Sequence, residues 1–341
     1  MLNTVYRLVA PRRFEAEFTD LSVNDNIVFV RPTHLSICAA DQRYYQGKRD
    51  PNILKKKLPM SLIHEGVGDV IFDLKGEFEI GQSVAMVPNT PVENDPIIAE
   101  NYLRSSKFRA SGFDGFMQDI VAIERNRIVC LPDDIDKNVA AFTELVSVTY
   151  HTINRFIEKS NSRRNTIGIW GDGNLGFITA LVLKKRLPKA KVLVFGIDEV
   201  KLSDFVFVDQ IYDVTEVPED LLVDHAFECV GGPASASAID QIIDHINPEG
   251  SIGLMGVSEE RVPVNSRMIL EKGLTLFGSS RSGVEDFRDT IEFYKENEDV
   301  PEYLKNIIDD IIEIRSMNDI IHAFESDIGK KGGKTVMVWK K

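Results

Sequence analysis

Three glycines near the middle of the chain constrain its fold more than any other feature. The segment IGIWGDGNLGFITAL places Gly171, Gly173 and Gly176 between a strand-like apolar run and a helix-like one, with Asn174 and Leu175 inside the turn. The first glycine allows a tight turn, the second lets the backbone approach a pyrophosphate, and the third permits close packing of the helix on the strand. A helix N-terminus adds N–H donors and a partial positive charge. The pattern predicts a dinucleotide-binding strand–loop–helix unit.

The sequence around this loop alternates strand-like and helix-like runs. KVLVFG, HAFECVGG, GSIGLMGV and LTLFGSS are short and apolar, and FITALVLKKRL and SASAIDQIIDHI have helical spacing. Near-continuous apolarity is typical of strands in a parallel sheet covered on both faces. The alternation favours a doubly wound α/β domain of the Rossmann type over the alternative, an ordinary glycine-rich turn.

The rest of the chain predicts a second domain of different character. Before about residue 131 the runs IVFVRP, VGDVIF and SVAMVP are short and end at turn residues, which indicates a β-rich domain with irregular loops. A chain of 341 residues also exceeds what one core usually holds. We expect domains at 1–146 and 147–281, and a segment at 282–341 that completes the first domain. That segment has an irregular stretch around IIDDIIEI and a β-like end, GGKTVMVWKK.

Composition excludes several classes of function. The formal net charge of −13 argues against a duplex-binding surface, which needs clustered Lys and Arg, although a few local cations can still bind one anionic substrate. The sequence shows no secretion signal and no apolar stretch of roughly 20 residues, so we expect no membrane insertion. Three cysteines without a pairing pattern favour a reduced, cytoplasmic location.

The strand after the glycine loop bears on the choice of cofactor. It ends at Gly196, where an NAD site usually places an acid that accepts from the ribose 2′-hydroxyl. Glycine removes the carboxylate that would repel a 2′-phosphate, so NADP(H) is favoured, with Lys201 as the nearby cation. If Asp198 takes the place of the acid instead, the preference reverses.

Four residues in three separate segments could bind a metal. Cys38 lies in SICAADQRYYQG, His64 and Glu65 lie in LIHEGVGDV, and Glu144 lies in FTELVSVTYH. A thiolate, an imidazole and a carboxylate form a reasonable zinc set that leaves one position open for substrate. Spacing alone does not join them. Cys38 could be a small core residue, His64 a turn donor and Glu144 a charge at a helix N-terminus.

The motifs together resemble those of a known family. The chain is similar to the medium-chain dehydrogenase/reductase superfamily of zinc-containing alcohol and polyol dehydrogenases. The similarity lies in the segments Cys38–Gly47 and His64–Val70, in the glycine loop and in the order of the domains. The resemblance covers essentially the whole chain. It implies a GroES-like catalytic domain joined to the Rossmann domain, and an oxidoreductase that acts on CH–OH groups.

The resemblance also implies roles for individual residues. Cys38 and His64 would bind the catalytic zinc, Glu144 would be the third ligand as in the polyol branch, and Glu65 would approach the metal as a fourth. Asp41 matches an acid that orients the site from behind the ligands.

Two departures from the family pattern are informative. No cysteine lies at 89–112, where many members hold a structural zinc, so we expect one zinc ion. Ala40 stands where the family often has a hydroxyl that relays the proton, which leaves bound water, Glu65 or Tyr44 for that role. Tyr44 matches a residue that lines the polyol site, although it could simply pack the loop.

Within the family the chain most resembles the members that reduce ribulose 5-phosphate to ribitol 5-phosphate with NADPH for wall teichoic acid. This implies a small sugar phosphate as substrate, a homo-oligomer, and a complex with the cytidylyltransferase that uses ribitol 5-phosphate. The candidates for holding the phosphate are Arg43, Lys48, Arg49 and Arg281. Each of them could instead be a solvated surface charge, Lys48 and Arg49 more so than the other two. The alternatives are an NAD-dependent polyol dehydrogenase and a non-catalytic dinucleotide-binding relative.

Overall fold

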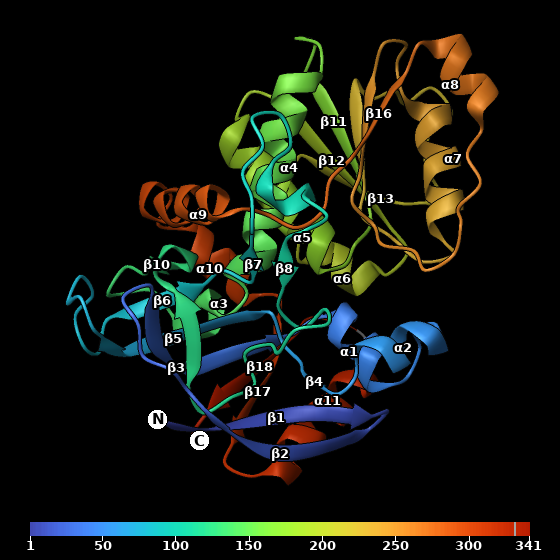
Figure 1. Ribbon diagram of the computed structural model, residues 1–341. Coiled ribbons are helices and arrows are strands. Elements are labelled where there is room, and N and C mark those ends of the chain that lie inside the picture. The colour runs from blue at the N-terminus through green and yellow to red at the C-terminus, as the bar shows by residue number, and fades with distance from the viewer. Residues whose placement is uncertain (331) are drawn as a thin grey trace. The chain divides into compact units, whose positions relative to one another are not determined.

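The computed structural model describes residues 1–330 and 332–341, which form two compact units (Figure 1). The first unit comprises Met1–Ser147 together with Ser282–Lys341, and the second comprises Val148–Arg281. Helix α4 (Thr143–Lys159) begins in the first unit and ends in the second. None of the described helices is both long and apolar enough to cross a membrane.

The second unit is built on a parallel sheet with the strand order β13-β12-β11-β14-β15-β16. Counted along the chain this order is 3-2-1-4-5-6, which is that of a doubly wound dinucleotide-binding sheet. The predicted Rossmann domain is therefore confirmed. Its elements are β11 (Thr166–Trp170), α5 (Asn174–Arg186), β12 (Lys191–Gly196), α6 (Glu199–Ser203), β13 (Gln210–Asp213), β14 (His225–Glu228), α7 (Ser235–His245), β15 (Ser251–Leu254), α8 (Ser266–Lys272) and β16 (Thr275–Gly278).

Helices cover both faces of this sheet, with α5 on one side and α7 on the other (Figure 1). Strand β11 is buried from Ile167 to Trp170, and α5 is buried without a break from Gly176 to Leu183. A helix that is apolar all round lies inside a protein rather than on its surface. The near-continuous apolar runs in the sequence have the same cause, because neither face of the sheet meets water.

The first unit is a β-rich body. Its largest sheet has the order β10-β6-β5-β3-β18-β17, with β9 also paired to β3, and two smaller sheets have the orders β2-β1-β4 and β7-β8. Its elements are β1 (Leu2–Ala10), β2 (Arg13–Asp20), β3 (Ile27–Ile37), α1 (Ala39–Tyr45), α2 (Pro51–Lys57), β4 (Met60–Ser61), β5 (Glu65–Asp73), β6 (Ser83–Met86), β7 (Asn89–Thr90), η1 (Glu100–Tyr102), β8 (Lys107–Phe108), β9 (Val121–Glu124), η2 (Arg125–Arg127), β10 (Ile128–Cys130), α3 (Lys137–Ala140), α9 (Val284–Glu296), α10 (Val300–Lys305), β17 (Ile308–Ile314), α11 (Met317–Gly329) and β18 (Lys334–Trp339).

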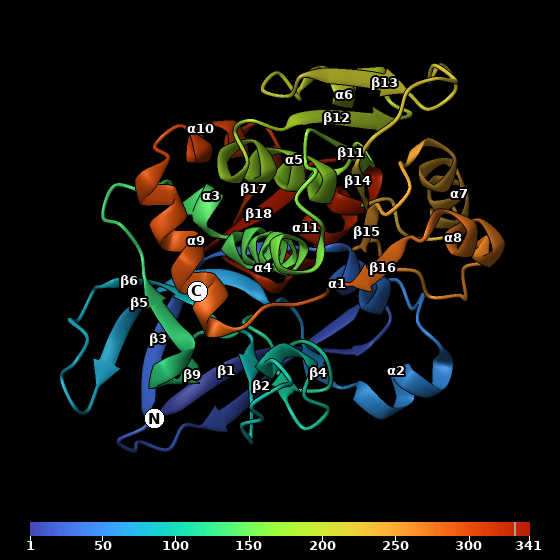
Figure 2. The same cartoon turned by 90° about the horizontal axis from the view of Figure 1, so that it is seen from above.

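The C-terminal segment supplies two strands of the large sheet. Strand β18 pairs antiparallel with β3, from Thr335 opposite Ile37 to Val338 opposite His34, and parallel with β17. Figure 2 shows the orange helices α9 and α10 near the green helix α3, and α10 contacts α3. The expectation of an irregular stretch around IIDDIIEI was wrong, because β17 is an edge strand, with one shift of register between Ile308 and Asp310. Its two adjacent aspartates interrupt the apolar alternation that would identify a strand.

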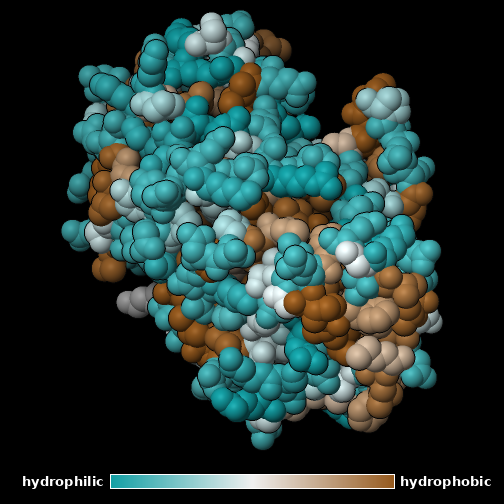
Figure 3. Space-filling model, turned by 90° about the vertical axis from the view of Figure 1, so that its left-hand side faces the viewer, coloured by the Kyte–Doolittle hydropathy of each residue, from teal (hydrophilic) through white to brown (hydrophobic). Residues whose placement is uncertain are grey.

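The surface drawn in Figure 3 is mostly hydrophilic. Hydrophilic side chains cover most of the face drawn in Figure 3, and hydrophobic side chains gather there in separate patches. Scattered apolar side chains on a surface are normal, since polar groups cannot cover a whole protein.

Candidate functional site

The first unit brings three potential metal ligands together. Cys38, His64 and Glu65 each offer a ligand atom, and these atoms all lie within 4.8 Å of one another. Cys38 Sγ lies 3.4 Å from His64 Nε2. A thiol, an imidazole and a carboxylate thus converge from two of the three segments, and the third segment, with Glu144, is not part of this group.

Cys38 is held at the junction of β3 and α1. It is the N-cap residue of α1, and its Sγ accepts a hydrogen bond of 3.3 Å from Ala40 N. Asp41 Oδ2 accepts a hydrogen bond of 3.2 Å from Cys38 N, which completes a capping box. The thiol therefore has a fixed direction before any ligand binds.

His64 lies between β4 and β5, on a backbone that is held from the other side. Gly115 N donates to Ser61 O at 2.8 Å, and Phe116 N donates to Ile63 O at 2.7 Å. A Cβ atom at Gly115 would lie only 2.2 Å from Leu62 O, so this approach requires a glycine. The segment around residue 115 thus supports the backbone that carries His64.

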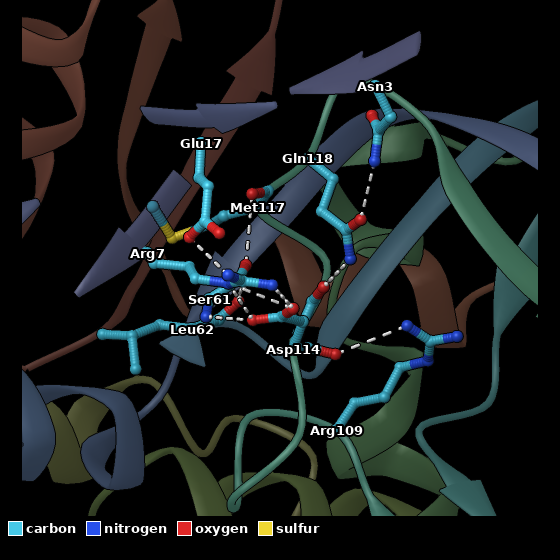
Figure 4. A network of polar contacts seen from close by, with 10 residues as sticks. Asn3, Arg7, Glu17, Ser61, Leu62, Arg109, Asp114, Met117 and Gln118 are labelled. Carbon is cyan, nitrogen blue, oxygen red and sulfur yellow. Dashed lines mark hydrogen bonds and ion pairs between the residues drawn. The ribbon is translucent and has the colours of Figure 1, made fainter. Parts of the chain in front are cut away.

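A network of polar contacts holds this supporting segment in place (Figure 4). The carboxylate of Asp114 accepts from Ser61 N at 2.8 Å and from Arg7 Nη2 at 2.7 Å. Gln118 Oε1 accepts from Asn3 Nδ2 at 3.0 Å. These bonds tie β1, β4 and the 114–118 segment together, so the position of His64 depends on residues far from it in sequence.

Asp41 stands behind His64, as the resemblance implied. Its buried carboxylate accepts from Ile63 N at 3.0 Å, and its Oδ1 lies 3.7 Å from His64 Nδ1. Burial by itself would raise the pKa of Asp41, but His64 and the hydrogen bonds hold it below the usual value. Burial would likewise lower the pKa of His64, but Cys38 and Asp41 raise it well above the usual value.

Lys334 on β18 completes the surroundings of Glu65, and the sequence reasoning missed it. Its Nζ donates to Glu65 Oε2 at 2.6 Å and to Ile37 O at 3.1 Å. The side chains of Lys334 and Glu65 are only 2% and 1% exposed. One signal was present, since a lysine inside the apolar run KTVMVW needs a buried partner.

Glu144, at the start of α4, is buried but lies outside the group of three. Burial raises the pKa of its carboxyl to about 7, with His64, Glu65 and Lys334 among its electrostatic neighbours. It is therefore near the ligands without adjoining them, and its role as a ligand stays a prediction.

Tyr44 on α1 is buried, and two cationic side chains contact it. Lys57 Nζ donates to Tyr44 Oη at 3.0 Å and to Ser111 Oγ at 2.9 Å. The guanidinium of Arg49 lies 4.7 Å from the centre of the tyrosine ring. Lys57 is a cation that the sequence reasoning did not single out.

The donor set fits a zinc ion. Zinc in proteins takes thiolate, imidazole and carboxylate ligands. Burial raises the pKa of the Cys38 thiol to about 11, and the nearby Asp41 adds to this. A cation at this point would reverse that balance and favour the thiolate.

The second unit presents the glycine loop as the sequence predicted. The loop lies between β11 and α5, where Gly171 has a φ of 128° and Gly173 is the N-cap residue of α5. A Cβ atom at Gly176 would lie 1.9 Å from Gly171 O, which explains the third glycine by close packing of helix on loop. Asn174 and Leu175 form the first turn of α5.

A cavity of about 450 Å³ adjoins this loop, lined among others by Gly171, Gly173 and Gly196. Gly196 is the last residue of β12. The sequence suggested that no acid lies beside it, but the carboxylate of Asp172 occupies that space. Lys201 on α6 and Arg281 after β16 do not belong to the lining.

Family models match both parts of the chain. Residues 24–133 match the alcohol dehydrogenase GroES-like domain, and residues 177–296 match the zinc-binding dehydrogenase model. The chain is 56% identical to ribulose-5-phosphate reductase 1 of Staphylococcus aureus, over 99% of each. It is 53% identical to the ribulose-5-phosphate reductase of Bacillus spizizenii, over 100% of each.

Solved structures agree with this grouping. The crystal structure of S. aureus TarJ in complex with NADPH has a TM-score of 0.90 and 51% identity, with 100% of both chains covered. L-idonate 5-dehydrogenase from Escherichia coli has a TM-score of 0.86 at 21% identity, over 99% of this chain and 98% of that one, and so shares the fold. Since both domain models match and full-length relatives exceed half identity, the chain belongs to the zinc-binding dehydrogenase family.

Proposed function

We propose that the protein reduces ribulose 5-phosphate to ribitol 5-phosphate, with NADPH as the reductant and one catalytic zinc ion. The observation that carries this proposal is the buried cluster of Cys38, His64 and Glu65. It occurs in a chain that is similar, over its full length, to proteins named for this reduction.

The first unit would hold the metal through Cys38, His64 and Glu144, with Glu65 as the residue that approaches it. When bound, zinc would polarise the C2 carbonyl of the ketose, to which NADPH supplies the hydride. Asp41 Oδ1 faces His64 Nδ1 at 3.7 Å, and its Oδ2 fixes Cys38 through the backbone N–H of that residue. Lys334 holds Glu65 by its Oε2 atom and so limits how far this carboxylate can move.

Reduction of a carbonyl to an alcohol also requires a proton. Tyr44 offers a hydroxyl that already accepts a hydrogen bond from Lys57, which leaves its own proton to be donated onward. With bound water and Glu65 as the alternatives, this hydroxyl compensates for Ala40, which has no hydroxyl of its own.

The substrate phosphate requires cations, and the α1–α2 region carries many. Arg43, Lys48 and Arg49 lie between the two helices or at their ends, and α2 closes with Lys55, Lys56 and Lys57. Lys57 and Arg49 both contact Tyr44. This local excess of positive charge, in a chain of net charge −13, supports a phosphorylated substrate over a free polyol.

The proposal extends to the cell. The reaction belongs in the cytoplasm, and its product would feed CDP-ribitol and poly(ribitol phosphate) teichoic acid synthesis. We expect a homo-oligomer and a complex with a ribitol-5-phosphate cytidylyltransferase. Size-exclusion chromatography coupled to light scattering, alone and with that enzyme, tests both expectations.

The activity itself is tested with purified, zinc-loaded protein by following the ultraviolet absorbance of the reduced cofactor. NADPH and NADH are each paired with ribulose 5-phosphate and with unphosphorylated ribulose. Rapid turnover of NADPH with the phosphorylated ketose supports the proposal, and removal of zinc by a chelator should abolish it. Turnover with NADH and free ribulose would identify a polyol dehydrogenase instead. Nucleotide binding without any turnover would identify a non-catalytic relative.

A further inference from the structure

The glycine loop of the second unit contains a carboxylate in an unexpected place. Asp172 lies between Gly171 and Gly173, and its Oδ2 accepts hydrogen bonds from Ile197 N at 2.8 Å and from Asp198 N at 2.9 Å. These two N–H groups belong to the residues that directly follow β12. A side chain from the first loop thus caps the backbone at the end of the second strand.

Gly196 makes this contact possible. A Cβ atom at Gly196 would lie 2.6 Å from both the Cβ and the Oδ2 of Asp172, closer than real Cβ contacts allow. Since the φ of Gly196 is not in the left-handed region, its backbone conformation does not demand a glycine. The missing side chain therefore serves to admit Asp172.

The cavity beside this corner is apolar and carries a single charge. Among the described residues that line it, Asp172 has the one charged side chain, while Gln241 and Ser237 are polar and neutral. Trp170 and Phe195 form a stacked pair in the lining, with ring centroids 3.9 Å apart. No lysine or arginine of the described chain belongs to the lining, so nothing in it offsets the carboxylate.

This arrangement bears on the adenosine ribose of a dinucleotide. In doubly wound sheets the ribose lies at the end of the second strand, where an acid accepts from its 2′-hydroxyl. Asp172 brings an acid to that corner from another loop, and its Oδ1 has no hydrogen-bond partner in the described chain. A 2′-phosphate placed at the end of β12 would find Ile197 N and Asp198 N already bonded to Asp172, and it would face a like charge.

We propose that Asp172 limits the preference for NADPH over NADH, by competing with the 2′-phosphate for Ile197 N and Asp198 N. With NADH bound, its Oδ1 accepts from the ribose 2′-hydroxyl. With NADPH bound, the phosphate displaces the carboxylate from one or both amides. The inference rests on the proposed function only in that the second unit binds a nicotinamide dinucleotide.

The test uses fragments that contain only the adenosine half, so it needs neither zinc nor turnover. Isothermal titration calorimetry compares adenosine 2′,5′-bisphosphate with adenosine 5′-monophosphate, on the full chain and on Asp172→Asn and Asp172→Ser. Asp198→Asn is the matched control. Asp198 is the other acid that the sequence offered for the ribose, but its Oδ1 caps α6 by accepting from Val200 N and Lys201 N, and asparagine is an equally good cap. The Asp198→Asn substitution also removes one negative charge next to the end of β12.

Loss of the charge at Asp172 should tighten the bisphosphate about tenfold relative to the monophosphate, whereas Asp198→Asn should change the ratio less than about twofold. NADPH and NADH should follow the same order. Equal weakening of both fragments by both Asp172 variants would show that Asp172 merely shapes the loop. Selective weakening of the bisphosphate would show that it aids the phosphate. Either result overturns the inference and leaves the proposed reduction of ribulose 5-phosphate to be judged by its own assay.

Discussion

Replacement of Lys334 by methionine isolates the contribution of the buried ion pair behind the metal cluster. The change leaves the carboxylate of Glu65 without its ammonium partner at 2.6 Å, and it removes the hydrogen bond from Lys334 Nζ to Ile37 O. Removing one partner of a buried ion pair typically costs about 3–5 kcal/mol, because the remaining charge stays desolvated. We expect the free energy of unfolding of the metal-free first unit to fall by about 4 kcal/mol.

The two tryptophans allow this loss to be measured in one unit alone. Trp339 lies in the first unit and Trp170 in the second, so a Trp170→Phe background leaves a fluorophore that reports on the first unit. Urea unfolding in the presence of a chelator then gives the free energy of Lys334→Met, Glu65→Gln and the double variant. Zinc should restore more stability to Lys334→Met than to the parent, because the unpaired carboxylate gains a cation.

The double variant decides the interpretation. With both charges removed, the loss should be smaller than the sum of the two single losses by about 2 kcal/mol or more. A single-variant loss below about 1 kcal/mol, or strict additivity, would refute the view that this pair is coupled and desolvated.

Three further predictions follow from the same structure. Cys38→Ala should remove the bound zinc, measured by atomic absorption, and abolish reduction, while NADPH affinity stays unchanged because the glycine loop lies in the second unit; retention of zinc would contradict the ligand assignment. Gly115→Ala should destabilise the first unit by about 1–3 kcal/mol in urea unfolding and weaken zinc binding, since its Cβ would meet Leu62 O. Gly329→Ala, where a Cβ meets nothing within 4 Å, is its control. Burial lowers the pKa of His225 to about 4. As the pH falls, this histidine is therefore protonated in the unfolded chain before it is protonated in the folded one. The second unit should therefore lose up to about 3 kcal/mol as the pH falls from about 6.5 to about 4, and His225→Gln should flatten that dependence in Trp170 fluorescence.

Features that depend on neighbouring residues were predictable from the sequence. The glycine loop, the strands around it and the parallel sheet follow from local turn geometry and apolar patterning, and the structure confirms them. Cys38, His64 and Glu65 were named because they resemble a family motif, and they do converge.

Features that depend on long-range contacts were not predictable. Lys334 lies 269 residues from Glu65, and no spacing rule joins them. Gly196 was interpreted as the loss of an acid, whereas its missing side chain makes room for Asp172, which only the spatial arrangement reveals. Strand β17 was overlooked because its adjacent aspartates hide the alternation, and its pairing with β18 decides its structure.

The pairing of β18 with β3 has a consequence for the order in which the chain folds during translation. The second unit is one continuous segment and can fold as soon as it leaves the ribosome, whereas the first unit lacks β17 and β18 until after that. At usual rates of synthesis, roughly 10–40 s separate the appearance of Ser147 from that of Lys334. Throughout this interval Cys38 and His64 exist without the lysine that neutralises Glu65. The nucleotide-binding half of the nascent protein is thus completed before the metal-binding half, although synthesis of the metal-binding half begins first.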